Sequence, residues 1–239
     1  MSFKAHIAAL IPGSRQAYIR YWYRKAVGHL GKEMDVFLDF ARPGSVAIDV
    51  GANVGVYAYA LARRGARVIA FEPLPYYAEC TSAIKNVIVH QVALSDHAGI
   101  ESVSLPLLNG QPNPVEATLG KLDVPHVSKS VTVATLDSFA LRNVSALKID
   151  VEGHELHVIR GALQTIEREK PALLVEIESR HTRQSVRDTI LSIEALGYAG
   201  SFVDGKGRWL TSPDFDPQTH QSAPPGTRSY VNNFLFRPL

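Results

Sequence analysis

The sequence has very little cysteine, no long apolar run and almost no excess charge. Cys80 is the one cysteine among 239 residues, which excludes internal disulfides and Cys-rich zinc sites. No apolar stretch approaches the roughly 18 residues that a membrane-spanning helix needs. A formal net charge of +2 gives no long-range attraction to nucleic acid or acidic lipid. We therefore expect a soluble cytoplasmic protein without a nucleic-acid partner, with Cys80 packed on the apolar side of a short helix.

The amino-terminal part, residues 1–44, is expected to form a helical cap. Residues 5–11 are apolar, like a weak signal peptide, but His6 and Pro12 interrupt the pattern, so we expect them to remain in the mature protein. Basic and aromatic side chains are frequent between residues 15 and 25. Such a helix could lie on a membrane surface or stack on nucleotides. We expect instead that its aromatic side chains pack on the rest of the chain, or on a second copy in a homodimer.

Residues 45–239 alternate short β-branched runs with helical stretches. This pattern is typical of an α/β fold, a mainly parallel sheet with helices on both faces, and we expect one domain over residues 1–239. Residues 97–134 break the alternation, with an edge-like strand at 101–105 and a proline-containing loop at 109–114. The expected strands are 45–50, 66–72, 87–94, 146–151, 172–177, a hairpin of 198–203 with 208–210, and 233–236, and the expected helices include 76–85.

A glycine turn follows the first expected strand and precedes a helix. Gly51, Asn53 and Val56 stand where a dinucleotide-binding turn would have three glycines, so the spacing argues against NAD. Glu72 ends the next strand about 20 residues after Gly51, where a carboxylate can accept hydrogen bonds from both hydroxyls of a ribose. These features predict a nucleoside ligand without pyrophosphate, for which S-adenosylmethionine is suitable.

A second charged segment lies at the end of the strand expected at 146–151. Alternation places Lys148, Asp150 and Glu152 on one face of this strand. Charged side chains on a central strand are costly unless they are paired or line a cleft. Lys148 could simply neutralise Asp150, and Glu155 could serve the dipole of the following helix. For Asp150 we favour a functional role, because it lies beside the expected ligand pocket.

Five segments together resemble the FkbM family of S-adenosylmethionine-dependent methyltransferases. They are residues 47–55, 71–73, 92–96, 135–137 and 147–155, of which the Lys-Ile-Asp-Val-Glu-Gly string is the most specific. The resemblance implies a class I methyltransferase (Rossmann-like) fold, with a seven-stranded mixed sheet whose last strand is antiparallel. It implies O-methylation of a hydroxyl on a sugar or polyketide-like natural product, with S-adenosyl-L-homocysteine as the other product.

The resemblance also implies roles for individual residues. Asp49, Gly51, Asn53 and Gly55 would line the methionine end of the cofactor, Glu72 with Pro73 would hold the ribose, and Ala93, Leu94 and Ser95 would lie by the adenine. The acceptor would be a small molecule or a glycan. We expect residues 104–120 and the amino-terminal helices to hold it.

A hydroxyl acceptor is a poor nucleophile, so the reaction calls for a general base. Asp150, Glu152, His154 and Glu176 are the candidates. His154 has the ordinary pKa closest to neutrality, but it could equally be an exposed histidine in the first turn of a helix. The acidic residues could alternatively hold Mg²⁺, although nothing in their spacing demands it, so we expect no obligatory metal.

Two other functions remain as alternatives. One is an NAD-dependent oxidoreductase on a related sheet. The other is a non-catalytic binding module that uses the basic amino-terminal helix.

Overall fold

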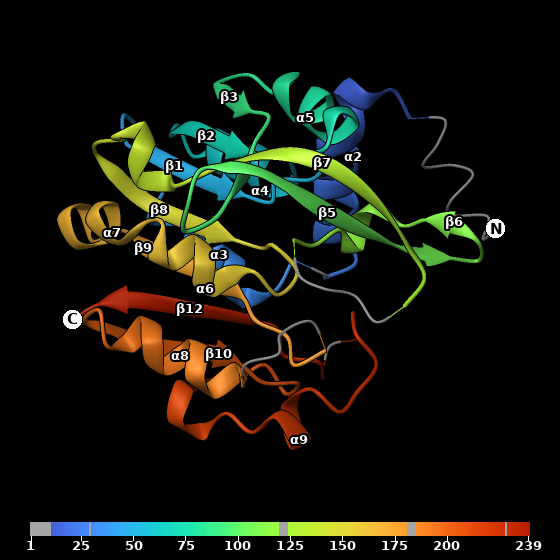
Figure 1. The fold of residues 1–239 in the computed structure, drawn as a ribbon. Helices are drawn as coiled ribbons and strands as arrows, with labels where there is room; N and C mark the ends of the chain where they lie inside the picture. Colours follow the sequence, from blue (N-terminus) through green and yellow to red (C-terminus); the bar gives the residue numbers. More distant parts are fainter. Residues whose placement is uncertain (1–10, 29, 120–123, 181–184, 228) are drawn as a thin grey trace.

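The computed structural model describes residues 11–28, 30–119, 124–180, 185–227 and 229–239 (Figure 1). The expectation for residues 5–11 falls almost wholly outside them. The helices are α2 (Gly13–Ala26), α3 (Lys32–Leu38), α4 (Val56–Arg63), α5 (Pro75–Ser82), α6 (Glu155–Arg160), α7 (Leu163–Glu169), α8 (Val186–Glu194) and α9 (Pro217–His220). The strands are β1 (Val46–Val50), β2 (Arg67–Phe71), β3 (Val87–His90), β4 (Ala93–Leu94), β5 (Gly99–Leu108), β6 (Gln111–Pro112), β7 (His126–Ala134), β8 (Val144–Ile149), β9 (Ala172–Glu176), β10 (Tyr198–Val203), β11 (Trp209–Thr211) and β12 (Asn233–Pro238).

The main sheet has the order β11-β10-β12-β9-β8-β1-β2-β3 in the described part of the chain. Strands β3, β2, β1, β8 and β9 are parallel neighbours, whereas β12 runs antiparallel to both β9 and β10. This confirms the expected mixed sheet with an antiparallel last strand. The hairpin expected around Asp204 is also present, and its second arm, β11, extends the sheet to eight strands.

The sheet has an apolar core on each face, because alternate side chains of each central strand point to opposite sides. One core contains Ala47, Val68 and Leu174 with side chains of α3 and α4. The other contains Ile48, Phe71 and Val175 with side chains of α6, α7 and α8. All six residues of β8 are buried, as expected for a strand covered on both faces. The fold is therefore a three-layer arrangement of helices, sheet and helices.

A second sheet, in the order β4-β7-β5-β6, occupies the region that breaks the alternation. The expected strand 87–94 is wrong in extent: it is two strands, and β4 leaves β3 to pair with β7. The expected edge strand 101–105 is part of the longer β5, which pairs with β7 over eight residue pairs. Residues 109–114, expected as a loop, instead contain the short β6, which folds back on the end of β5. Helix α5 also ends three residues before the expected position.

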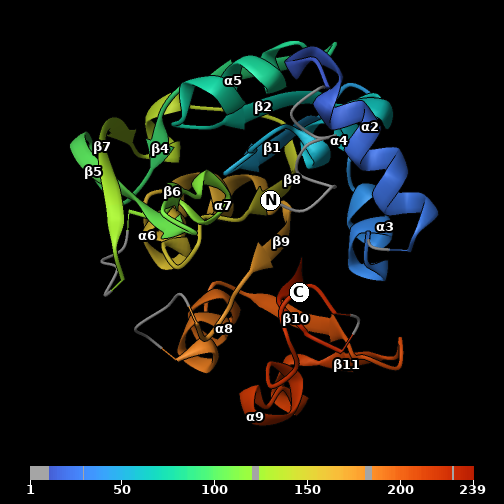
Figure 2. The same ribbon diagram turned by 90° about the vertical axis from the view of Figure 1, so that its right-hand side faces the viewer.

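The described amino-terminal residues are helical, as α2 and α3. Helix α2 packs on α4 and α5, with Ala17 and Tyr21 buried and Tyr18 and Tyr23 more than half exposed. Figure 2 shows α2 and α3 along one side of the molecule and the β5–β7 hairpin along the other. The Lys32 ammonium donates a hydrogen bond of 2.8 Å to the carbonyl of Gly207, which fixes the β10–β11 turn beside α3. Within the described residues, no helix combines the length and apolar character that crossing a bilayer requires.

Candidate active site

A cavity of about 940 Å³ opens at the carboxyl ends of β1, β2, β8 and β9. It lies where the chain order of the sheet reverses, between β1 and β8, which is the usual ligand position in open α/β sheets. Its volume is near the top of the range of about 300–1,000 Å³ typical of ligand pockets. It has room for more than one small ligand group. We call its two walls the glycine-turn side (residues 50–56, 71–74 and 93–94) and the carboxylate side (residues 150–154, 176–180 and 230–233).

The glycine-turn side begins where β1 ends. Gly51 has a φ of +74°, and a Cβ there would lie 1.8 Å from the backbone oxygen of Asp150, so only glycine fits. Asn53 also has a positive φ, +50°, a conformation that asparagine tolerates better than most residues. Gly55, with a φ of +85°, is the residue before α4 and packs against Thr81 and Ile84. The turn therefore presents backbone groups, rather than bulky side chains, to the cavity.

Glu72 follows β2 and is bonded to this turn. Its two carboxylate oxygens accept hydrogen bonds from the backbone N–H groups of Asn53, at 2.8 Å, and Leu74, at 2.9 Å. Burial raises the pKa of Glu72 to about 7, although both backbone donors lower it. Each carboxylate oxygen retains a further lone pair, so Glu72 is fixed in position and can still accept from a ligand hydroxyl.

Asp49 lies beneath the turn and not among the cavity-lining residues. It is buried, and its Oδ2 atom has no hydrogen-bond partner among the described residues. Burial raises the pKa of Asp49 to about 7, because the nearby Lys148 compensates the cost of desolvation only in part. A polar buried atom without a partner is uncommon in folded proteins and marks a site that something else completes.

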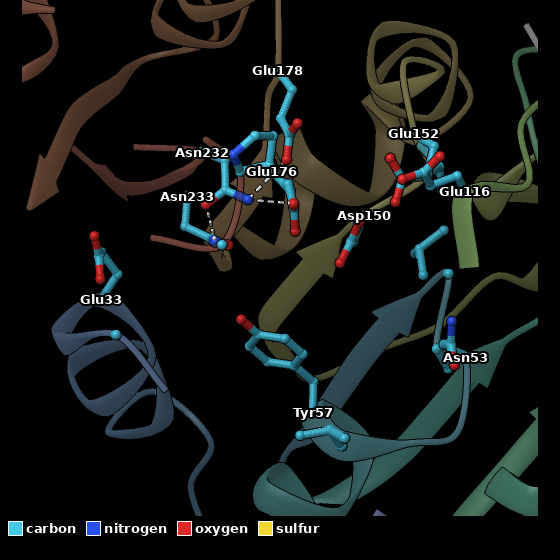
Figure 3. A pocket seen from close by; sticks show the side chains of 18 of the residues that line it. Glu33, Asn53, Tyr57, Glu116, Asp150, Glu152, Glu176, Glu178, Asn232 and Asn233 are labelled. Carbon is cyan, nitrogen blue, oxygen red and sulfur yellow. Dashed lines mark hydrogen bonds between the residues drawn. The ribbon is translucent and has the colours of Figure 1, made fainter. Parts of the chain in front are cut away.

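Lys148 lies behind the carboxylate side and is fully buried. Its ammonium lies 3.4 Å from the Asp150 carboxylate, 3.9 Å from that of Glu176 and 5.0 Å from the centre of the Tyr57 ring. Burial alone would lower the pKa of Lys148, but these neighbours raise it above its ordinary value. The expected pairing of Lys148 with Asp150 is therefore present, in a larger cluster. Figure 3 shows Asp150, Glu176 and Tyr57 directed toward the same space.

Glu176 and Glu178 bind the start of β12. The side-chain amide of Asn232 donates to both carboxylates, and the Arg180 guanidinium pairs with Glu178. Burial and the neighbouring Asp150 raise the pKa of Glu176 well above its ordinary value. Burial opposes ionisation of Glu178 as well, but Arg180 and Glu176 lower its pKa to about 2. Within the pair, Glu176 is thus the less acidic member and Glu178 the more acidic one.

His154 is buried, so the alternative that it is an exposed histidine in the first turn of a helix is wrong. A hydrogen bond of 2.9 Å joins its Nε2 to the Ser95 hydroxyl, and its ring stacks on His157. Burial lowers the pKa of His154 to about 4, and the imidazole is therefore neutral near pH 7. Glu155 is buried too and accepts from the N–H of Gly153, so it does more than serve the helix dipole.

The structure brings most of the candidate residues to one cavity. Its lining includes Gly51, Asn53, Glu72, Pro73, Ala93, Leu94, Asp150, Glu152, His154 and Glu176. Asp49, Gly55 and Ser95 lie behind this lining. Glu152 is not on the face of a strand, since β8 ends at Ile149 and Glu152 is in a turn with a φ of +52°.

Several lining residues are absent from the sequence-based candidates. They are Glu33, Tyr57, Glu116, Glu178, Arg180, Tyr230, Asn232 and Asn233. Glu178 carries a signal in the sequence, because it lies two residues beyond Glu176 in an alternating segment. Asn232 precedes β12 and Asn233 begins it, and because β12 is antiparallel to β9, its start meets the carboxyl ends of the parallel strands. Tyr57 fits the apolar pattern of α4, so the pattern gives no sign that its hydroxyl has a role in the cavity.

The strand order, the reversal point and the glycine turn together define a class I methyltransferase fold. The crystal structure of methyltransferase FkbM from Methylobacillus flagellatus has this fold in common with the chain, with a TM-score of 0.52 at 16% identity. The alignment covers 81% of this chain and 43% of that one. The family model of the methyltransferase FkbM domain matches residues 49–199, and the chain belongs to the FkbM methyltransferase family.

Two curated proteins are similar in sequence. Hexuronic acid methyltransferase AglP of Haloferax volcanii is 31% identical, over 56% of this chain and 59% of its own length. The 31-O-demethyl-FK506 methyltransferase FkbM of Streptomyces tacrolimicus is 28% identical, over 50% of this chain and 60% of its own length. The chain thus spans about three fifths of the length of these relatives.

Proposed function

We propose that the protein is an S-adenosylmethionine-dependent O-methyltransferase acting on a hydroxyl of a sugar or polyketide-like small molecule. The family assignment supports methyl transfer, and the two relatives are named for a hexuronic acid and for 31-O-demethyl-FK506. The proposal depends on one observation: two different walls face each other in one cavity. One wall is a glycine turn with Glu72 fixed beside it, and the other is a cluster of carboxylates around Lys148.

The glycine-turn side has suitable chemistry for S-adenosylmethionine. Glu72 would hold the ribose hydroxyls, and the backbone at Gly51 and Asn53 would contact the methionine part. Ala93 and Leu94 offer an apolar surface at the start of the second sheet for the adenine. The unpartnered oxygen of Asp49 would complete its hydrogen bonding through the methionine amine or a bridging water.

When bound, S-adenosylmethionine supplies a methyl group already activated by a positively charged sulfur. The residues of the protein then have to align the acceptor oxygen, which can contribute on the order of 7–11 kcal/mol in well-oriented cases. The cavity has the volume to bring both ligands together at the carboxylate side.

Asp150 is the best-placed general base among the four candidates. It lines the cavity, whereas Glu176 has a raised pKa and accepts a hydrogen bond from Asn232. Lys148, at 3.4 Å, holds the Asp150 carboxylate in place. His154 is a weaker candidate, because its Nε2 is bonded to Ser95. Glu152 lines the same cavity and would serve to orient acceptor hydroxyls.

The test separates cofactor binding from turnover. Calorimetry with S-adenosylhomocysteine should show Glu72→Ala binding about tenfold or more weakly than the parent, since a charged hydrogen-bond acceptor is lost. Asp150→Asn should bind it like the parent, but turn over at least about 10²-fold more slowly in a mass-spectrometric assay of methylated glycan and polyketide acceptors. Glu167→Gln, on the exposed face of α7, is the matched control and should change neither.

Parent-like cofactor binding and turnover in both variants would show that the role assignment is wrong. Failure of the parent to bind S-adenosylhomocysteine, with thermal stabilisation by NAD instead, would replace the proposed function by the oxidoreductase alternative.

A further inference from the structure

Four cationic side chains line the cavity on the side of the amino-terminal helices. Arg20 and Arg24 belong to α2, Lys32 begins α3, and Lys206 lies in the β10–β11 turn. We call these four the basic rim. From residue 11 to residue 32 the chain contains no Asp or Glu, so α2 brings positive charge to the cavity without an acid of its own.

Two members of the basic rim already have partners. Lys32 donates to the carbonyl of Gly207, and Arg20 donates to the side chain of Gln16 at 2.9 Å. Among the described residues, the side chains of Arg24 and Lys206 form no hydrogen bond or ion pair. Both are exposed, and both therefore have unused donors.

The nearby acids do not neutralise this charge. Asp204 accepts hydrogen bonds from the backbone of Lys206 and Arg208 and pairs with the Arg208 guanidinium at 2.7 Å. Glu33 is buried and accepts from the N–H of Val203 at 3.2 Å. Asp204 and Glu33 thus accept hydrogen bonds from neighbouring groups of the protein, whereas the side chains of Arg24 and Lys206 in the basic rim have no such partner among the described residues.

Arg24 is also placed to act inside the cavity. Arg20 and Arg24 are four residues apart and share one face of α2. Arg24 lines the same cavity as Tyr57, whose ring centre lies 5.0 Å from the Lys148 ammonium. Lys25, by contrast, is over the ring of Trp22 at 5.4 Å and is not part of the cavity lining.

We propose that the methyl acceptor carries an anionic group, a carboxylate or a phosphate ester, which Arg24 and Lys206 bind while a neighbouring hydroxyl reaches Asp150. This inference rests on the proposed function and specifies its substrate class. Arg24 and Lys206 are specificity residues in it, and neither contacts the reacting atoms. An ion pair between one exposed cation and the ligand contributes only modestly to the binding affinity. We therefore expect Arg24 and Lys206 to bind the anionic group together.

The probes are methyl β-glucuronide, glucose 6-phosphate and the neutral methyl β-glucoside, with protein saturated by S-adenosylhomocysteine. Calorimetry at low salt should show at least one anionic probe binding about tenfold more tightly than the neutral one. This preference should fall about threefold in Arg24→Ala and be nearly lost in the double variant with Lys206→Ala. Arg24→Lys should retain most of it, and about 0.5 M NaCl should weaken it in the parent.

The matched control is the double variant of Arg15→Ala and Lys129→Ala, which removes two exposed charges outside the cavity lining. It should bind all probes like the parent, and no variant should change the affinity for S-adenosylhomocysteine. Preference for the glucuronide identifies a sugar acid as acceptor, and preference for the phosphate identifies a phosphorylated sugar.

The inference is overturned by equal binding of neutral and anionic probes, by no anionic probe binding below about 10 mM, or by equal losses in control and rim variants. If the protein binds S-adenosylhomocysteine and one of these results is obtained, only the anionic acceptor is wrong. If it does not bind S-adenosylhomocysteine, the proposed function itself fails.

Discussion

The two sides of the cavity are built in different ways. The glycine-turn side consists of short segments that each follow a strand, and its shape depends on backbone groups at Gly51 and Asn53. The carboxylate side consists of acidic side chains that follow β8 or end β9, together with amide side chains at the start of β12, and the acidic ones face Lys148. The first side is therefore constrained by backbone conformation, and the second by electrostatic balance. Substitutions should therefore destabilise the first side through steric and backbone strain, and the second side through unbalanced charge.

The largest effect is expected where two backbone segments approach each other. Gly51→Ala would place a Cβ 1.8 Å from the Asp150 carbonyl oxygen, in a backbone conformation that alanine rarely adopts. We expect a loss of more than about 4 kcal/mol in unfolding free energy, measured by denaturant titration. Gly110→Ala is the matched control, since Gly110 has nearly the same φ, +75°, and nothing within 4 Å. Equal losses in the two variants would show that φ alone, and not the close approach, matters.

The carboxylate side should be nearly as sensitive to loss of its central cation. Lys148→Met leaves the half-buried carboxyl groups of Asp150 and Glu176 without the ammonium that faces them, and losing one partner costs about 3–5 kcal/mol in fully buried pairs. Chemical denaturation should show this loss, and Lys129→Met, at an exposed position, should not. Stability like that of the parent would mean that the carboxylates take up protons at little cost.

Asp49 should make stability depend on pH. The pKa of Asp49 is raised to about 7, so the folded protein holds a proton there that the unfolded chain releases above about pH 4. The stabilisation from this proton is complete below pH 4 and is lost as the pH rises through 7. An asparagine at this position has no proton that titrates in this range, so the stability of Asp49→Asn should not fall in this way. Between pH 5 and pH 8 the variant should therefore gain about 2 kcal/mol in unfolding free energy relative to the parent.

Asp35→Asn, on the exposed face of α3, is the control for this pH series and should parallel the parent at every pH. A constant difference between Asp49→Asn and the parent from pH 5 to pH 8 would contradict the raised pKa.

The smallest effect is expected at the outer edge of the carboxylate side. The Arg180 guanidinium lies 3.3 Å from the Glu116 carboxylate and joins the second sheet to the segment after β9, but both side chains are more than a third exposed. Glu116→Gln should change the unfolding free energy by less than about 1 kcal/mol in thermal denaturation. A larger loss would mean that this contact supports the second sheet.

The sequence predicted the glycine-turn side well, because its information is local. A β-branched run, a glycine turn and an acidic residue after the next strand imply a position at one edge of a parallel sheet, and Gly51, Asn53 and Glu72 are found there. The error at residues 87–94 arises because the pattern is local. Residues 87–90 and 93–94 are similarly apolar, so the pattern does not show that the chain passes from the main sheet to the second sheet between them.

The carboxylate side was predicted only in part. Asp150 follows β8 and Glu176 ends β9, and both were predicted, but Tyr230, Asn232 and Asn233 come from a distant segment whose position depends on the direction of β12. An antiparallel strand brings its beginning, rather than its end, to the ligand edge, and no local pattern around Asn232 indicates that direction. Of the basic rim, Arg20 and Arg24 lie in the basic and aromatic segment at residues 15–25, but helical periodicity alone does not show which cations of that segment face the cavity.

The position of β12 between β9 and β10 has a consequence for synthesis on the ribosome. The glycine turn packs on the backbone of Asp150, which follows β8, and the opposite wall waits for residues 232 and 233. Domains generally fold as units during translation. A nascent chain halted before β12 would lack an interior strand of the sheet as well as part of the cavity wall, so unfinished molecules would be catalytically silent.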